Sequence, residues 1–188
     1  MLIGITGTDG AGKGTVVEYL VKQRGYLHFS SRGLIIRELL QKGLPTDRPH
    51  LRQMANELRA HYGDDYVIKA ALAEVRESAL DHLIIESIRT TAEVAALRRA
   101  GGILLAVDAD VEVRFARIQG RGSASDQVTF DEFVAQEQLE MNDPDPHGMQ
   151  KAMVMAMADY TIINNASVKE LEEAIEVALM VPGEKTGK

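Results

Sequence analysis

The sequence of 188 residues contains no cysteine and no tryptophan, and only 5% of its residues are aromatic. Without cysteine, the protein has neither disulfide bonds nor thiolate ligands for zinc. No apolar run approaches the roughly 20 residues that a membrane-spanning helix needs, so we expect no membrane partner. An excess of basic residues is also missing: the formal net charge of −7 argues against a general nucleic-acid-binding protein. These absences favour a cytoplasmic protein, and they still allow a local basic pocket for a small anion.

The sequence does contain enough apolar residues, 45% of the total, to build a core. Five short, almost continuous apolar runs alternate with segments of helical periodicity, a pattern typical of parallel strands buried on both faces. This order implies βαβ units with right-handed crossovers, and therefore one three-layer α/β domain over residues 1–188. The predicted strands are Leu2–Thr6, Leu27–Ser30, Leu83–Glu86, Ile103–Asp108 and Tyr160–Asn164.

Three predicted helices begin with a hydroxyl residue followed three positions later by glutamate, the capping-box pattern. Residues 142–148, with the sequence NDPDPHG, predict a loop between two helices. The methionine-rich segment 149–158 predicts helix packing or the lining of a mobile lid, and residues from about 182 to 188 predict a disordered tail. The three capping pairs are Thr90/Glu93, Thr129/Glu132 and Ser167/Glu170.

The most specific motif is GTDGAGKGT at residues 7–15, directly after the first predicted strand and at the start of a helical segment. Its glycines let consecutive backbone N–H groups point at an anion, and the helix that follows adds its positive dipole end. Lys13 can reach the outer phosphates of a nucleotide as a point charge. The motif therefore predicts a site for the phosphates of ATP. Its predicted members are Gly7, Asp9, Gly10, Ala11, Gly12, Lys13, Gly14 and Thr15.

This loop resembles the phosphate loop of nucleoside monophosphate kinases, which commonly ends in Gly-Lys-Gly-Thr. The resemblance implies a P-loop kinase fold: a five-stranded parallel sheet in the order 2-3-1-4-5, with helices on both faces and a helical lid. It also implies ATP as phosphoryl donor and Mg²⁺ as cofactor. We expect an acceptor-binding helical insertion at about residues 31–80 and the lid at about residues 118–150. The strict motif has serine or threonine at position 14, so we expect Thr15 to supply the hydroxyl instead.

Phosphoryl transfer depends on positioning and on neutralising negative charge, so further cations should face the loop. By similarity to the family segment after the second strand, Arg37 is the predicted acceptor arginine. Arg32 is an extra cation that this similarity does not explain, and we expect it to bind the acceptor as well. Arg89 falls at the place of the family's arginine after the third strand, at the edge where α/β sheets bind ligands. Glu86 ends that strand, where it can orient magnesium-bound water or pair with one of these arginines. With Thr15 it forms the predicted metal site.

Arg114, Arg117 and Arg121 recur at spacings of three and four, which places them on one helix face, where they repel each other unless an anion intervenes. The segment resembles the helix that leads into the lid of these kinases, so the three arginines are predicted to act with Lys13 on the transferring phosphoryl group. Residues 157–175 resemble the last strand and helix of dephospho-CoA kinases. That resemblance implies adenine contacts at Asn164, Asn165 and Ala166.

Three functions remain open. A nucleoside or deoxynucleoside monophosphate is the favoured acceptor, because Ser30-Ser31-Arg32 lacks the aspartate that dephospho-CoA kinases carry there and because the predicted arginines suit a phosphate. Dephospho-CoA is the alternative acceptor, since it contains a diphosphate and Glu86 could act as a base. A non-catalytic nucleotide-binding regulatory module is the third possibility, favoured by the departures from the family pattern at Leu34 and Glu86-Ser87. The predicted partners are ATP and a small phosphorylated acceptor, with no nucleic acid.

Overall fold

The computed structural model describes residues 1–75, 82–120 and 128–180. In these ranges five parallel strands form one sheet, and each lies within one residue of its predicted bounds. The strands are β1 (Leu2–Gly7), β2 (Leu27–Ser30), β3 (Leu83–Glu86), β4 (Ile103–Asp108) and β5 (Tyr160–Ile163). Their order in the sheet, β2-β3-β1-β4-β5, confirms the predicted topology.

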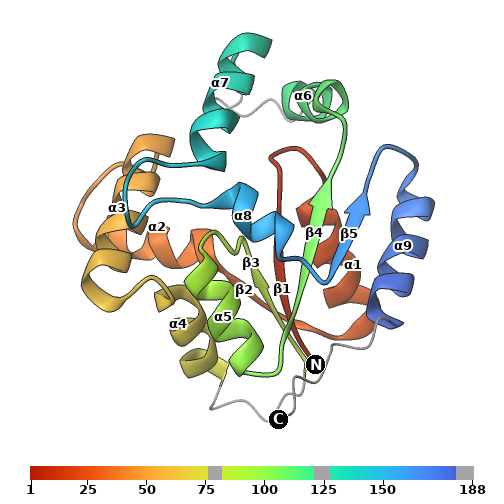
Figure 1. Cartoon of the computed structure of the whole chain (residues 1–188), viewed down its shortest axis with the longest axis horizontal. Helices are drawn as coiled ribbons and strands as arrows, with labels where there is room; N and C mark the ends of the chain where they lie inside the picture. Colours follow the sequence, from red (N-terminus) through yellow and green to blue (C-terminus); the bar gives the residue numbers. More distant parts are fainter. Residues whose placement is uncertain (76–81, 121–127, 181–188) are drawn as a thin grey trace.

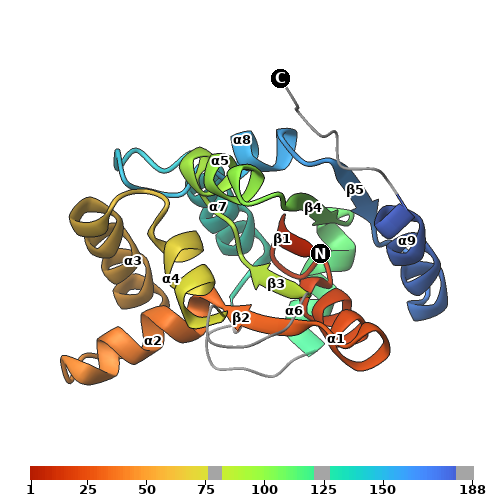
Figure 2. The same ribbon diagram turned by 90° about the horizontal axis from the view of Figure 1, so that it is seen from below.

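Helices cover both faces of this sheet (Figures 1 and 2). Helices α1 (Lys13–Arg24) and α9 (Val168–Met180) pack on one face. Helices α4 (Tyr66–Val75), α5 (Thr91–Arg99) and α8 (Lys151–Ala156) pack on the other. Each face carries its own buried apolar cluster, because the strands present apolar side chains in both directions. The described part of the chain thus has the three layers that the alternating pattern predicted.

Four further helices lie around the carboxyl ends of the strands and beyond the β2 edge (Figure 1). Helices α2 (Ser31–Gln41) and α3 (Arg48–Tyr62) pack on each other through a small apolar cluster of their own, built around Leu39 and Met54. Helices α6 (Val111–Gly120) and α7 (Phe130–Met141) stand above the ends of the strands.

All three predicted capping boxes are present, with each hydroxyl accepting a backbone N–H and each glutamate accepting one in return. Residues 142–148 connect α7 to α8, as predicted. The predicted tail at about 182–188 lies outside the described residues. No helix in the described ranges is long and apolar enough to cross a bilayer.

Gly4 in the central strand β1 shows how closely α5 approaches the sheet. A Cβ atom at this position would lie 2.5 Å from Cδ2 of Leu97 and 3.1 Å from Cγ1 of Ile88, and both side chains are fully buried. Protein interiors have few voids that could absorb the extra methyl group.

We therefore predict that Gly4→Ala lowers the free energy of unfolding by about 1–3 kcal/mol, the usual cost of overpacking a core. Gly14→Ala in α1 is the matched control, because nothing lies within 4 Å of a Cβ built there. Urea denaturation monitored by circular dichroism measures both variants. Equal midpoints for Gly4→Ala and the native protein would contradict the close packing of α5 on β1.

Candidate active site

The glycine-rich loop lies at the carboxyl edge of the sheet, between the end of β1 and the start of α1. Gly7 and Gly10 have positive φ angles of 133° and 82°. A Cβ atom on Gly7 would lie 1.9 Å from the carbonyl oxygen of Val107, and one on Gly10 would lie 2.6 Å from that of Arg114. Both positions therefore require glycine for space as well as for the dihedral angle. The loop backbone is held tightly against β4 and α6.

Lys13, the first residue of α1, folds back over this loop. Its ammonium donates hydrogen bonds to the carbonyl oxygens of Gly7, at 3.1 Å, and Thr8, at 2.6 Å. The side chain is only 10% exposed. Burial lowers the pKa of the ammonium from the ordinary 10.5 to about 8, although the nearby Asp9 carboxylate raises it. Lys13 is therefore a desolvated cation held at the centre of the loop.

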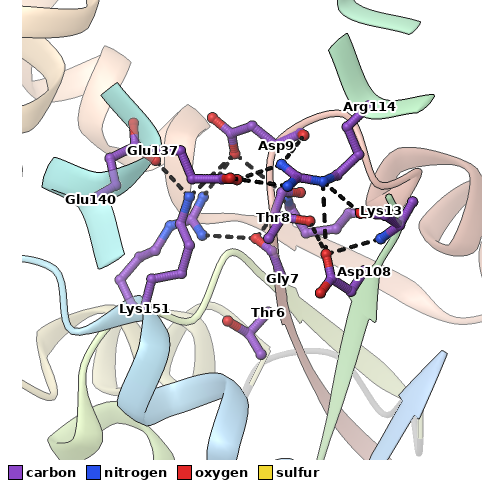
Figure 3. A network of polar contacts seen from close by, with 12 residues as sticks. Thr6, Gly7, Thr8, Asp9, Lys13, Asp108, Arg114, Glu137, Glu140 and Lys151 are labelled. Atoms are coloured by element: carbon purple, nitrogen blue, oxygen red, sulfur yellow. Dashed lines mark hydrogen bonds and ion pairs between the residues drawn. The ribbon is translucent and has the colours of Figure 1, made fainter. Parts of the chain in front are cut away.

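Asp9 lies in the same loop, surrounded by four cations from different parts of the chain, two of which, Lys13 and Lys151, are labelled in Figure 3. Its carboxylate is 3.6 Å from the ammonium groups of Lys13 and Lys151, 3.7 Å from the guanidinium of Arg48 and 3.9 Å from that of Arg89. Burial alone would raise the pKa of Asp9, but the four cations outweigh it and hold this pKa well below its usual range. Negative charge is strongly stabilised at this point.

Helix α7 is joined to this cluster through the side chains of Gln136, Glu137 and Glu140, and Figure 3 labels the two glutamates. Arg48 donates to Gln136 at 2.8 Å, and Lys151 donates to Glu140 at 2.6 Å.

Arg114 on α6 makes the third link to α7, because both terminal nitrogens of its guanidinium donate hydrogen bonds to the Glu137 carboxylate. The same guanidinium donates to the backbone oxygen of Asp9 at 3.4 Å and lies over the ring of Phe133. Each of the three cations that contact α7 thus also contacts Asp9. The phosphate loop and α7 are held together by shared counter-charges.

A cavity of about 680 Å³ opens beside the loop, between β3 and helices α2, α3 and α7. Arg52 and Arg59 from α3 line it, and both have carboxylate partners: Asp143 accepts two hydrogen bonds of 2.7 Å from Arg52, and Glu93 lies 3.4 Å from Arg59. The Arg32 side chain is exposed at the cavity, and no described residue forms an ion pair or hydrogen bond with its guanidinium. The arginines that line the cavity are Arg32, Arg48, Arg52, Arg59 and Arg89.

Glu86 lines the same cavity at the end of β3. His28 lies 3.0 Å from its carboxylate, and this hydrogen bond is the main reason why the pKa of Glu86 is lowered. Thr15 lines a smaller cavity instead, so the two predicted metal ligands stand at different cavities. In the described ranges no three His, Asp or Glu side chains form a group that could hold a metal ion.

The smaller cavity, of about 240 Å³, lies on the other side of the loop and is lined by Arg117, Asn164 and Ala166. Asn164 is buried, and its side-chain amide donates to the backbone oxygen of Ala11 at 2.8 Å. Arg117 donates to the backbone oxygen of Asn164, also at 2.8 Å. The Asn165 side chain accepts a hydrogen bond from the backbone N–H of Asp110. Two of the three residues predicted to contact adenine thus border this cavity.

The predicted acceptor arginine Arg37 lies away from these cavities. Arg37 is exposed on α2, where it pairs with the exposed Glu74 at 3.4 Å, and it does not line the large cavity. Arginines of the next helix, α3, line that cavity. Arg121 lies outside the described residues.

Four cations around the loop and the cavity were not predicted from the sequence. Arg48, Arg52 and Arg59 are separated by four and seven residues, which is the spacing of one helix face and could have indicated a basic surface on α3. Lys151 is the only charged residue in segment 149–158. The segment packs as predicted, and it also places the Lys151 ammonium 3.6 Å from the Asp9 carboxylate of the loop. The sequence signal for Lys151 was a single cation in an otherwise uncharged helical segment.

The chain matches a known sequence family over most of its length. The family, described as an AAA domain, matches residues 3–145. A UPF0200 protein of Thermococcus sibiricus is 31% identical over 182 residues, which are 94% of this chain and 92% of the relative. A UPF0200 protein of Pyrobaculum aerophilum is also 31% identical over 182 residues, covering 95% of this chain and 97% of the relative.

Solved structures with the same fold include small-molecule kinases. TT1252 from Thermus thermophilus superposes with a TM-score of 0.62 at 24% identity, covering 100% of this chain and 98% of that one. Shikimate kinase from Acinetobacter baumannii, in complex with shikimate, gives a TM-score of 0.56 at 18% identity, covering 95% and 92%. A gluconokinase from Sinorhizobium meliloti gives 0.52 at 13% identity, covering 94% and 90%. At these identities the likeness establishes the fold.

The electrostatics of the loop predict how the pKa of Lys13 responds to its neighbours. Because the Asp9 carboxylate raises this pKa against the effect of burial, Asp9→Asn should lower it further below about 8. A pH titration of the Lys13 ¹³Cε resonance by NMR measures the shift. Glu18→Gln, which removes an exposed carboxylate paired with Lys22, should leave the pKa of Lys13 unchanged. An unchanged or raised pKa in Asp9→Asn would contradict this arrangement.

Proposed function

This chain belongs to the AAA domain family and to the UPF0200 proteins, and from that premise we propose that it is an ATP- and Mg²⁺-dependent phosphotransferase. The acceptor we propose is a small phosphate-bearing molecule, foremost a nucleoside or deoxynucleoside monophosphate. The observation that carries the proposal is the phosphate loop with its ring of cations around Asp9, which opens into a cavity of about 680 Å³. A donor and an acceptor that both carry phosphate can meet at this point.

On the donor side, we propose that the loop backbone and Lys13 bind the ATP phosphates, while Arg114 and Arg117 hold the loop and the donor cavity in place. The smaller cavity beside Ala166 is the proposed place of the adenine. Thr15 and Glu86 supply oxygen ligands of the kind that Mg²⁺ prefers, acting directly or through water. When bound, the ion would neutralise charge on the phosphate oxygens.

On the acceptor side, the weak basicity of the carboxylates that line the cavity supports a phosphate acceptor rather than an alcohol. Transfer to an alcohol benefits from a carboxylate that accepts the hydroxyl proton, whereas a phosphate is already an oxyanion. Among the described residues, Asp9, Glu86 and Glu140 are the carboxylates that line the cavity. The pKa values of Asp9 and Glu86 are both lowered, which makes these groups weak bases, and Glu140 is paired with Lys151.

The proposed acceptor ligands are Arg32 and Arg89, with Arg48 at the boundary between donor and acceptor. Arg32 offers a guanidinium without a partner in the described residues, and Arg89 connects the cavity to the loop by donating to the backbone oxygen of Gly7 at 3.4 Å. We propose that the helical insertion at about residues 31–80 binds the acceptor and that the lid, at about residues 118–150, closes over it. Water excluded by such a lid cannot hydrolyse ATP.

Dephospho-CoA is the second candidate acceptor, and the length of the arginine row on α3 favours it. From Arg48 to Arg59 the helix rises about 16 Å at 1.5 Å per residue, which is longer than a single phosphate requires. Arg52 and Arg59, however, already have carboxylate partners. This pairing leaves the monophosphate as the first choice.

A coupled assay of ADP release tests the proposal with ATP, Mg²⁺ and a panel of nucleoside and deoxynucleoside monophosphates, with dephospho-CoA as a further acceptor. Stimulation by one monophosphate supports the proposed function and identifies the base. Stimulation by dephospho-CoA alone would replace the acceptor and keep the donor site. ATP binding without stimulation by any acceptor would instead favour a nucleotide-binding regulatory module.

Two arginine variants separate the cavity from the surface of α2. With the acceptor found in the panel, Arg89→Ala should lower kcat/KM by about 10²–10³-fold, the usual effect of removing one donor that stabilises transition-state charge. Arg37→Ala should change kcat/KM by less than about twofold, because an exposed pair such as Arg37–Glu74 contributes little. Steady-state kinetics measure both. A larger loss in Arg37→Ala than in Arg89→Ala would show that the cavity is not the acceptor site.

A further inference from the structure

Lys151 is a fully buried lysine, with 0% of its side chain exposed. An ammonium removed from water is costly unless opposite charges compensate it. Lys151 has two such partners, the carboxylates of Glu140 at 2.6 Å and Asp9 at 3.6 Å. Figure 3 shows its side chain directed from α8 toward both groups.

The backbone around Lys151 is anchored to the α/β core. The neighbouring Gln150 donates its backbone N–H to the carbonyl oxygen of Arg89 at 2.8 Å. The Gln150 side chain also accepts hydrogen bonds from the backbone N–H and the hydroxyl of Thr91, at 3.2 and 3.0 Å. Val154, one turn further along α8, is fully buried in the apolar cluster of that face. These contacts on either side of Lys151 fix the position of its backbone, and so of the base of its side chain.

The four cations around Asp9 fall into two groups according to what they can reach. Lys13, Arg48 and Arg89 line the large cavity, so a phosphate group there can draw their donors toward itself. Lys151 is fully buried and does not line the cavity, whereas its partners Asp9 and Glu140 do. Of the four, Lys151 is the cation that a phosphate group in the cavity would not contact.

We infer that Lys151 is a positioning residue for nucleotide binding: it neutralises Asp9 and Glu140 so that the loop can accept a polyphosphate beside them. The inference rests on the proposed function in one respect, that the loop binds ATP. Without Lys151, the Asp9 carboxylate and the phosphates repel each other in a partly desolvated site. Through Glu140 the same ammonium also fixes α7 over the loop.

Substitution by methionine tests this role, since it removes the charge and keeps an unbranched side chain of similar length. Lys151→Met should weaken ATP binding at least tenfold, measured by isothermal titration calorimetry. In an Asp9→Asn/Glu140→Gln background, where neither carboxylate is left to compensate, adding Lys151→Met should change the dissociation constant by less than about threefold. The matched control is Lys22→Met, which removes an exposed lysine of α1 and should leave ATP affinity unchanged.

The outcomes are distinct. Native affinity in Lys151→Met overturns the inference, and so does a loss that persists undiminished in the Asp9→Asn/Glu140→Gln background, because that loss would be merely structural. If Lys151→Met does not fold, the triple variant Asp9→Asn/Glu140→Gln/Lys151→Met is measured instead. In this variant none of the three residues carries a charge, so none is left buried without a partner. It should bind ATP within about threefold of the Asp9→Asn/Glu140→Gln protein, and weaker binding overturns the inference. Failure of the native protein to bind ATP would instead overturn the proposed function, and the inference with it.

Discussion

The carboxylate of Asp9 and the four cations around it form the interaction on which the rest of the site depends. The cations come from α1, α3, the connection after β3, and α8, so one point in space ties together segments that are more than a hundred residues apart. Arg114 and Lys151 extend this cluster to the carboxylates of α7. The relative placement of loop, sheet and α7 is therefore fixed by electrostatics as well as by the two apolar clusters.

Within this cluster, two kinds of cation differ in whether they line the large cavity. Arg114 and Lys151 are buried, have carboxylate partners on α7 and hold the loop in position. Lys13 and Arg89 line the large cavity, and we propose that they exchange Asp9 for a phosphate group there. Helix α7 itself carries no basic residue, so it supplies counter-charge to the site rather than positive charge. The positive charge that lines the large cavity comes from α1, α2, α3 and the connection after β3.

The strands, the capping boxes and the phosphate loop could be predicted because their signals are local: apolar runs, a hydroxyl with glutamate three residues later, and glycines after a strand. The strand order came from the resemblance to nucleoside monophosphate kinases. Arg37 was assigned by the same resemblance, but the geometry of α2 points it at Glu74 on the surface. Lys151 escaped prediction because its role depends on the packing of α8 against α5 and the loop. No local pattern encodes a contact between residues 9 and 151.

The most direct test of the central claim, that this cation-surrounded loop binds nucleotide phosphates, is a calorimetric titration of ATP into the native protein and into Lys13→Ala. Lys22→Ala, with an exposed lysine removed from the same helix, serves as the control. The account predicts that the native protein and Lys22→Ala bind ATP equally well and that Lys13→Ala binds at least tenfold more weakly. Equal affinity in all three proteins would contradict it.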